Sequence, residues 1–190
     1  MLKIKEMKTF KHSLLQNIQG KKVLYLFLLT NTVYATMLFI TIPNVMSFSN
    51  GMRLLDMQPF GYGHEYVHSL FRTLGPEGRR AYLYHQIPLD MVYPFLFGIS
   101  YCLVLAYFLN KYNRLKPPLV YVCLLPLIVG VADYFENFGI VYLLNAYPET
   151  SDGMVTFTLV FTLVKSMGTL LYFLILVGLL ILLVLKTLRK

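Results

Sequence analysis

The sequence is short of the residues that characterise soluble, secreted and redox-active proteins. Charged residues make up only 14% of the 190 residues, against 57% hydrophobic residues, whereas a soluble domain usually carries nearer a quarter charged residues. Tryptophan is absent, so tyrosine and phenylalanine must supply any interfacial aromatic side chains. The two cysteines, Cys102 and Cys123, both lie in apolar runs. This placement favours small buried hydrophobes over a disulfide framework or a redox pair.

Long apolar runs are abundant, and four of them approach the ~20 residues that a membrane-spanning helix needs. They predict an all-α membrane protein with a single domain, residues 1–190, built as an antiparallel bundle of four transmembrane helices. The predicted elements are a cytoplasmic N-terminal segment at 1–22, an extracytoplasmic loop at 44–85, and spans at 23–42, 86–109, 118–144 and 155–185. The first span is too long for a cleaved signal peptide, and no Ala-x-Ala-like site follows it, so we expect a retained anchor.

Acidic residues are few, and the basic residues are unevenly placed. Nine Asp and Glu stand against 17 Lys and Arg, for a formal net charge of +8. Twelve basic residues lie in the N-terminal segment, the loop between the second and third spans, and the C-terminus, whereas the long loop holds Arg53, Arg72, Arg79 and Arg80. The positive-inside rule therefore places both termini of this multi-pass protein in the cytoplasm. Nucleic-acid binding is disfavoured because no groove or stacking face is evident.

The long loop contains a predicted amphipathic helix at residues 63–74. Its apolar residues recur at spacings of three and four, as one helix face requires: Tyr66, Val67, Leu70, Phe71 and Leu74. Gly75-Pro76-Glu77-Gly78 is expected to end this helix. We expect the helix to rest on the membrane surface or to cap the bundle.

The same helix carries His64-Glu65-Tyr66-Val67-His68, a match to the HExxH pattern of zinc proteases. The spacing of His64 and His68 places both rings on one helix face, as zinc binding requires. No recognisable second motif contains the candidates for a third ligand, which are Asp56, Glu77, His85 and Asp90. His64 and His68 are therefore weak metal candidates, and a zinc metalloprotease is the least favoured alternative.

Ionisable residues inside a span cost roughly 2.5 kcal/mol or more each on insertion scales, so they usually mark a site. The second span holds Asp90, and the third holds Asp133, Glu136 and Asn137, which share a helix face because they stand at i, i+3 and i+4. The fourth span has a polar stripe of the same period: Thr158, Thr162, Lys165, Ser166 and Thr169. Both faces must look inward because hydrocarbon cannot satisfy polar groups.

Depth arithmetic brings residues of all four spans to one level. At ~1.5 Å per residue, the depths below the outer ends of the spans are roughly 13 to 18 Å for Asn31, Asp133, Glu136 and Lys165. Asp90 joins this level if its helix begins near Tyr82, with Pro88 introducing a bend. We therefore predict a polar cluster in the outer half of the membrane.

Three motifs resemble those of a group of small bacterial four-span membrane proteins: LGPEGRRAY at 74–82, LDMVYP at 89–94 and ADYFEN at 132–137. In that group the patterns run LGxxGRxxY, DxxxP and DxxEN. The resemblance covers roughly residues 61–169, and we expect a location in a bacterial inner membrane. It implies that eight residues matter together, without implying a reaction: Gly78, Arg79, Tyr82, Asp90, Pro94, Asp133, Glu136 and Asn137. The architecture is also similar to that of the emopamil-binding and sigma-2 type of sterol-isomerase domain.

These features predict an acidic pocket that binds a membrane lipid or a lipophilic or amphiphilic small molecule and acts on it by proton transfer. Asp133 and Glu136 are the catalytic candidates, with a protonated Glu136 donating and an ionised Asp133 accepting. The predicted ligand-binding residues are Asn31, Asp90, Tyr93, Asn137, Lys165 and Arg79. One lysine among three carboxyls leaves negative charge that a proton or a cation must balance.

Two further alternatives remain open, and we expect no cofactor. In the first alternative, the chain is a structural or accessory subunit whose polar network only fixes helix packing. In the second it is a proton- or cation-conducting element, which would need several chains to form a pore.

Overall fold

The structure, a computed structural model, describes the backbone of residues 2–188 and the side chains of residues 9–188. Five basic residues counted above, Lys3, Lys5, Lys8, Arg189 and Lys190, lie outside the described side chains. Residues 2–188 contain no β-strand. The α-helices are α1 (Leu2–Asn17), α2 (Gly20–Thr36), α3 (Ile42–Met46), α4 (His64–Ala81), α5 (Ile87–Lys111), α6 (Leu125–Ala146) and α7 (Asp152–Leu188). Two π-helical turns, η1 (Met37–Thr41) and η3 (Tyr82–Gln86), and two 3₁₀ turns, η2 (Leu55–Met57) and η4 (Leu119–Leu124), complete the described elements.

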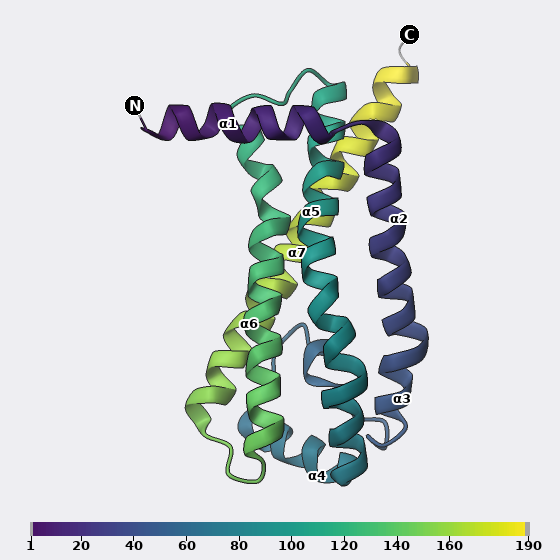
Figure 1. The fold of residues 1–190 in the computed structure, drawn as a ribbon, viewed down its shortest axis with the longest axis vertical. Helices are drawn as coiled ribbons and strands as arrows, with labels where there is room; N and C mark the ends of the chain where they lie inside the picture. Colours follow the sequence, from purple (N-terminus) through teal and green to yellow (C-terminus); the bar gives the residue numbers. More distant parts are fainter. Residues whose placement is uncertain (1, 189–190) are drawn as a thin grey trace.

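Four helical segments of the described chain are long and apolar enough to cross a membrane: Gly20–Met46, His64–Lys111, Leu119–Ala146 and Asp152–Leu188. They run alternately in opposite directions, so the N- and C-terminal ends lie at the same end of the bundle (Figure 1). α5 packs between α2 and α6, and α6 packs along α7. The prediction of an all-α bundle with four membrane-span helices is confirmed.

The helices extend beyond the bounds expected for the spans. The first continues from α2 through the π-helical turn η1 into α3, with Pro43 in the first turn of α3. α7 has 37 residues, or about 56 Å at the α-helical rise. Because this exceeds the ~30 Å hydrocarbon core of a bilayer, α7 must tilt or project, and it crosses the bundle obliquely (Figure 1).

The helix predicted at 63–74 is present, but the chain after it is helical where we expected a loop. α4 has its break at Gly75, whose φ of 61° and ψ of −177° belong to a region that essentially only glycine adopts. Pro76 then starts a new helical stretch, as proline favours a first helical turn, and this stretch runs through η3 and α5 to Lys111. The helix of the second span therefore begins at Pro76 instead of Gln86.

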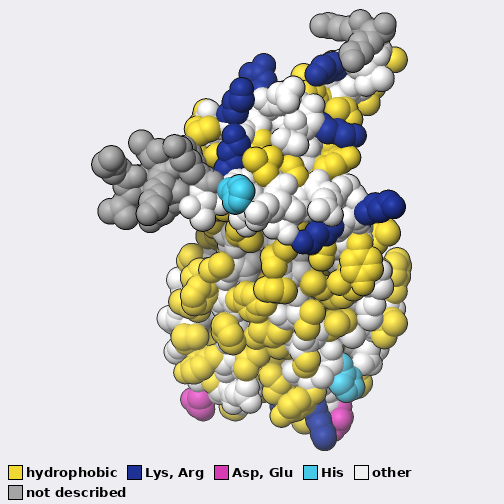
Figure 2. Space-filling view, turned by 45° about the horizontal axis from the view of Figure 1, so that its top comes forward, with side chains coloured by type: hydrophobic (Ala, Val, Ile, Leu, Met, Phe, Trp, Pro, Cys, Tyr) yellow, Lys and Arg dark blue, Asp and Glu magenta, His cyan; other side chains and the backbone are white. Residues whose placement is uncertain are grey.

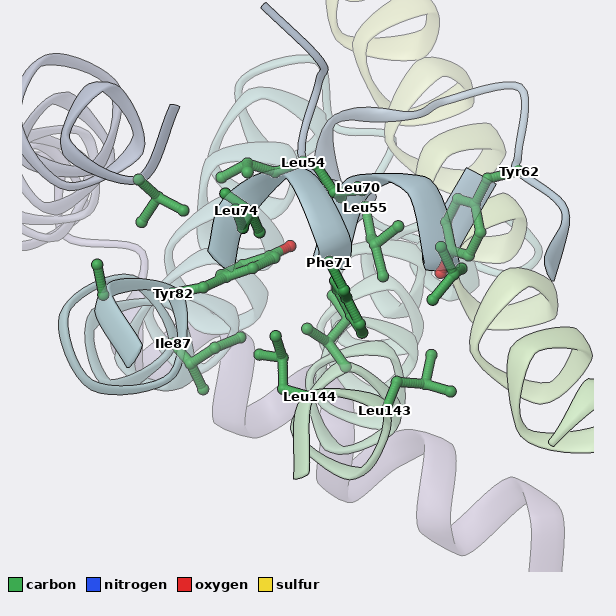
Figure 3. Packing of buried hydrophobic residues seen from close by; sticks show 14 of the residues in the cluster. Leu54, Leu55, Tyr62, Leu70, Phe71, Leu74, Tyr82, Ile87, Leu143 and Leu144 are labelled. Carbon is green, nitrogen blue, oxygen red and sulfur yellow. The ribbon is translucent and has the colours of Figure 1, made fainter. Parts of the chain in front are cut away.

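The loop at residues 47–63 and the first part of α4, up to Leu74, form a lid over one end of the bundle. The apolar face of the lid helix is fully buried, with Val67, Leu70 and Phe71 at 0% exposure. These side chains pack with Leu54 and Leu55 of the loop and with Ile87, Leu143 and Leu144 of the spans (Figure 3). Each such burial contributes about 1.5 to 3 kcal/mol, so the lid caps the bundle instead of resting only on the membrane surface.

α1 lies across the bundle axis at the end opposite the lid (Figure 1). Its Leu14 is buried at 4% exposure and packs with the α5 side chains Cys102, Leu103 and Ala106 in one apolar cluster. The sequence predicted only a cytoplasmic segment here, without a helix.

Candidate functional site

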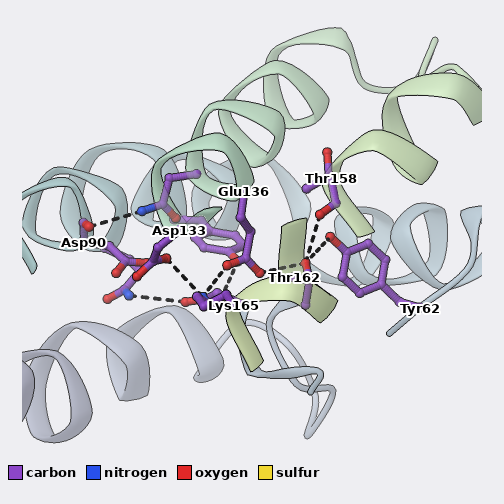
Figure 4. Close-up of polar contacts among 11 residues, drawn as sticks. Tyr62, Asp90, Asp133, Glu136, Thr158, Thr162 and Lys165 are labelled. Atoms are coloured by element: carbon purple, nitrogen blue, oxygen red, sulfur yellow. Dashed lines mark hydrogen bonds and ion pairs between the residues drawn. The ribbon is translucent and has the colours of Figure 1, made fainter. Parts of the chain in front are cut away.

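The centre of the polar cluster is a buried lysine shared by two carboxylates. Lys165 on α7 donates to Asp133 Oδ1 on α6 at 3.1 Å and forms a second ion pair with Glu136 Oε2. The side chain of Glu136 is 0% exposed, that of Asp133 is 6% exposed, and that of Lys165 is 17% exposed. Figure 4 shows the two carboxylates converging on the ammonium group from α6. The predicted sharing of one face by Asp133 and Glu136 therefore produces a three-residue ion network.

A hydroxyl chain connects this network to the lid. Thr162 Oγ1 donates to Glu136 Oε1 at 2.7 Å, and the phenol oxygen of Tyr62 lies 3.2 Å from Thr162 Oγ1 (Figure 4). Because the threonine has one proton and gives it to the carboxylate, Tyr62 is the donor in the outer bond. Burial raises the pKa of the Tyr62 phenol above its ordinary value, although its hydrogen bond with Thr162 acts in the opposite direction. Tyr62 therefore keeps its proton and remains a donor.

Asp90 on α5 also belongs to the cluster, but no described residue donates a hydrogen bond to its carboxyl group. The residue is buried at 3% exposure. No hydrogen bond or ion pair joins its carboxyl group to another described residue. Its backbone carbonyl accepts a hydrogen bond from Asn137 Nδ2 at 3.1 Å, which leaves Asn137 Oδ1 buried and unpartnered. The Asp90 carboxyl group and Asn137 Oδ1 therefore both lack a donor among the described residues.

Close helix contacts hold α5, α6 and α7 in the register that forms this cluster. A Cβ atom on Gly139 would lie 2.2 Å from Thr158 Oγ1 on α7, and one on Gly130 would lie 2.7 Å from the Pro94 carbonyl oxygen on α5. Small residues permit such approaches between membrane helices. The two glycines on α6 therefore permit its close approach to α7 on one side and to α5 on the other.

A second polar network, centred on Asp56 in the lid, lies beside the cluster and was missed in the sequence. Asp56 accepts hydrogen bonds from Tyr82 at 2.6 Å and from Gln86 at 3.4 Å. Gln86 Oε1 in turn accepts a hydrogen bond from Thr41. Asp56 entered the sequence analysis only as a zinc-ligand candidate. The sequence offered one signal, the tyrosine of the LGxxGRxxY motif, which is Tyr82. In the structure Tyr82 is 0% exposed, so its hydroxyl group needs a hydrogen-bond partner.

Three predicted ligand-binding residues are not bonded to the cluster. Asn31 Oδ1 accepts from Tyr101 at 3.2 Å, so α2 adds no hydrogen bond or ion pair to the cluster among the described residues. Tyr93 stacks on Tyr34 with ring centroids 5.4 Å apart. Arg79 donates to the Phe71 carbonyl at 2.7 Å and covers the Tyr147 ring at 4.6 Å. Arg79 therefore stabilises the end of the lid helix, and its binding of a ligand stays a prediction.

His64 and His68 bind the protein instead of presenting open metal ligands. Both Nε2 atoms lie within hydrogen-bond distance of Thr150 Oγ1, at 3.2 and 2.9 Å, and His64 lies 3.7 Å from Asp152. The described residues contain no group of three or more His, Cys, Asp or Glu side chains that could hold a metal ion. The pair thus connects the lid helix to the turn between α6 and α7.

The fold and these buried polar groups define an integral, multi-pass helical membrane protein. Comparison of the chain with protein-family models, curated proteins and solved structures finds no match. Two cavities of about 870 and 290 Å³ lie elsewhere in the molecule, and no residue of the polar cluster lines them.

Proposed function

We propose that this protein binds a lipophilic or amphiphilic small molecule whose ammonium or hydroxyl group donates to Asp90 and Asn137. Two observations carry this proposal: Asn137 Oδ1 is a buried acceptor without a hydrogen-bond partner, and the carboxyl group of Asp90, a residue at 3% exposure, accepts no hydrogen bond from a described residue. Leaving a buried acceptor unsatisfied costs about 1 to 3 kcal/mol, and more for a charged group. A ligand that supplies the donor recovers this free energy.

The charge balance supports a cationic or proton-bearing ligand. Lys165 is the basic residue of the cluster, and it already pairs with both Asp133 and Glu136. Asp90 adds a third carboxyl group with no counterion among the described side chains. In a low-dielectric interior this excess negative charge requires a proton or a positive group. An ammonium group beside Asp90 and Asp133 satisfies that requirement.

The surroundings favour a ligand that arrives through the membrane. The cluster lies inside apolar helices, and Lys165, at 17% side-chain exposure, is the most exposed of its three ion-paired members. Tyr93 and Phe97, one and two turns after Asp90 on α5, form part of an aromatic row with ring centroids 5.7 Å apart. Aromatic faces of this kind bind apolar groups and cations.

Proton transfer, if it accompanies binding, is best assigned to Asp90. Glu136 accepts a hydrogen bond from Thr162 and forms an ion pair with Lys165, so both of its oxygens are engaged and it is poorly placed to donate to a ligand. Asp133 is likewise bound to Lys165. The proposed step is an exchange of one proton between the ligand donor and the Asp90 carboxyl group, with Asp133 and Glu136 fixing Lys165. This assignment differs from the donor and acceptor roles expected for Glu136 and Asp133.

Native mass spectrometry of the purified protein tests the proposal. The wild type is compared with Asp90→Asn, Asp90→Leu and Asp133→Asn, and with Glu77→Gln as a control, because Glu77 is an exposed acid outside the cluster. We expect a co-purifying small molecule in the wild type and the control, and its loss in Asp90→Leu and Asp133→Asn. An ammonium ligand is also lost from Asp90→Asn, whereas a hydroxyl ligand, which needs only an acceptor, is retained.

The structural alternative gives a different result. If the network only fixes helix packing, the spectra of the wild type and all variants show no bound molecule, and the variants differ only in thermal stability. Helix content from circular dichroism separates loss of ligand from loss of fold. Ligand-free spectra from folded wild-type protein in native-membrane extracts would overturn the proposal.

A further inference from the structure

A groove of about 870 Å³ lies at the end of the bundle away from the lid. It is lined mainly by aliphatic side chains of α7, together with the end of α5 and η4; among them are Leu109, Val122, Ile175 and Leu182. Its volume lies in the upper part of the range typical of ligand sites. The oblique course of α7 opens this groove, because the end of α7 leans away from α5 (Figure 1).

Two basic side chains stand in the lining of this apolar groove. They are Arg114, from the loop between α5 and η4, and Lys186, near the end of α7. The loop is anchored, because the backbone N–H of Arg114 donates to the Leu109 carbonyl at 2.8 Å and Leu115 is 3% exposed. Lys186 lies 5.5 Å from the centroid of the Tyr112 ring, and the Tyr112 hydroxyl donates to the Leu179 carbonyl on α7 at 3.1 Å. The backbone at Arg114 and the ammonium group of Lys186 are therefore both held at the groove by protein contacts.

This end of the molecule has no described acid to neutralise the two cations. Every acidic side chain that the structure describes belongs to residues 56–152, in the lid, the second part of α4, the polar cluster or the turn between α6 and α7. Neither Arg114 nor Lys186 forms an ion pair within the described residues. Lys and Arg side chains gather at the same end in the space-filling view (Figure 2). The groove thus combines an apolar floor with uncompensated positive charge.

The length of the groove matches one leaflet. From Lys186 to Ile175 the lining follows α7 for eleven residues, or roughly 16 Å at the helical rise. Half of the ~30 Å hydrocarbon core is about 15 Å. A lipid whose headgroup lies at Lys186 therefore ends its acyl chain near Ile175.

We propose that this groove binds an anionic phospholipid of the leaflet on the side of the chain termini. The phosphate group contacts Arg114 and Lys186, and one acyl chain lies along α7 between Leu182 and Val122. Basic residues at the membrane boundary attract anionic headgroups, and a guanidinium group binds phosphate oxygens in a bidentate manner. This site is separate from the polar cluster and independent of the ligand proposed there.

Lipid retention measured by native mass spectrometry tests the site, with phosphatidylglycerol and phosphatidylcholine of identical acyl chains as probes. Delipidated wild type is titrated beside Arg114→Gln/Lys186→Gln and beside Arg72→Gln/Arg80→Gln, which removes two exposed charges at the opposite end. Each basic residue near the surface contributes about 1 kcal/mol to binding of anionic lipid. The first double variant should therefore weaken phosphatidylglycerol binding roughly 30-fold, and the control should not.

A third variant tests the groove itself. Leu182→Trp fills the apolar floor and leaves both cations in place, so it should also release phosphatidylglycerol. Unchanged retention in Leu182→Trp would place the lipid outside the groove and overturn the proposal. Equal binding of the two lipids by the wild type, or equal losses in the two double variants, would overturn it as well.

Discussion

Lys165→Met is the substitution with the largest expected effect on stability. Lys165 is the counterion of both Asp133 and Glu136, and the Glu136 side chain is 0% exposed. Removing one partner of a buried ion pair costs about 3 to 5 kcal/mol, because the other charge is left without compensation. For soluble chains of 150 to 250 residues, 1 kcal/mol shifts the melting temperature by about 2 to 4 °C. We therefore expect Tm to fall by about 6 to 20 °C.

The chain contains its own reporters for this measurement. It has no tryptophan, which makes intrinsic fluorescence weak, but its two free cysteines, Cys102 and Cys123, are both buried. A thiol-reactive fluorogenic dye therefore reports thermal unfolding of detergent-solubilised protein when these thiols become accessible. Lys116→Met is the matched control, because Lys116 is exposed and surface substitutions usually change stability by less than about 0.5 kcal/mol.

A double variant isolates the electrostatic cause. Lys165→Met/Glu136→Gln removes one of the two stranded carboxylates, and contacting residues couple by about 0.5 to 3 kcal/mol. The double variant should therefore be more stable than Lys165→Met alone. A wild-type Tm for Lys165→Met, or a double variant less stable than the single one, would refute the view that uncompensated charge dominates at this site.

Three further substitutions probe the packing and the lid, each by the same thiol assay. Gly139→Ala places a Cβ atom 2.2 Å from an α7 oxygen and should lower the free energy of unfolding by about 1 to 3 kcal/mol through overpacking. Gly153→Ala is the control, because the space around Gly153 is open. Equal effects of the two substitutions would contradict the close contact. Gly75→Ala should cost about 1 to 3 kcal/mol because its φ of 61° disfavours a side chain, and an unchanged Tm would argue against the break. Tyr82→Phe removes the 2.6 Å hydrogen bond to Asp56 and should cost about 1.5 to 3 kcal/mol; no loss would mean that Asp56 has another donor.

The ion network was predictable from the sequence because helix periodicity alone links its members. Asp133 and Glu136 stand at i and i+3, and Thr162 and Lys165 have the same spacing, so each pair necessarily shares a face. Hydrocarbon cannot satisfy such faces, which forces them together. The four-helix bundle followed from the apolar runs by the same constraint.

The partner of Asn31 could not be predicted from its depth, because a residue's depth gives its level in the membrane but not the direction in which its side chain points around the helix. Asn31 turns to Tyr101 on α5, a contact that no spacing within one helix can predict. The helical restart at Pro76 was also missed, since Gly-Pro pairs usually end helices, and here the glycine makes the break while the proline begins the next turn. Asp56 lies in a loop without periodicity, so its partners depend entirely on tertiary packing.

The unbroken helical stretch from Pro76 to Lys111 has a mechanical consequence. One helical rod joins the exposed Arg80 on the lid side to Asp90 and then to Lys111 at the opposite end of the bundle, with the π-helical turn η3 and Pro94 inside it. Lys165 belongs to a different rod, α7, which is longer than the bilayer is thick. A membrane that thins or thickens tilts the two rods by different amounts, and the separation of Asp90 from Lys165 then changes with the lipid composition around the protein.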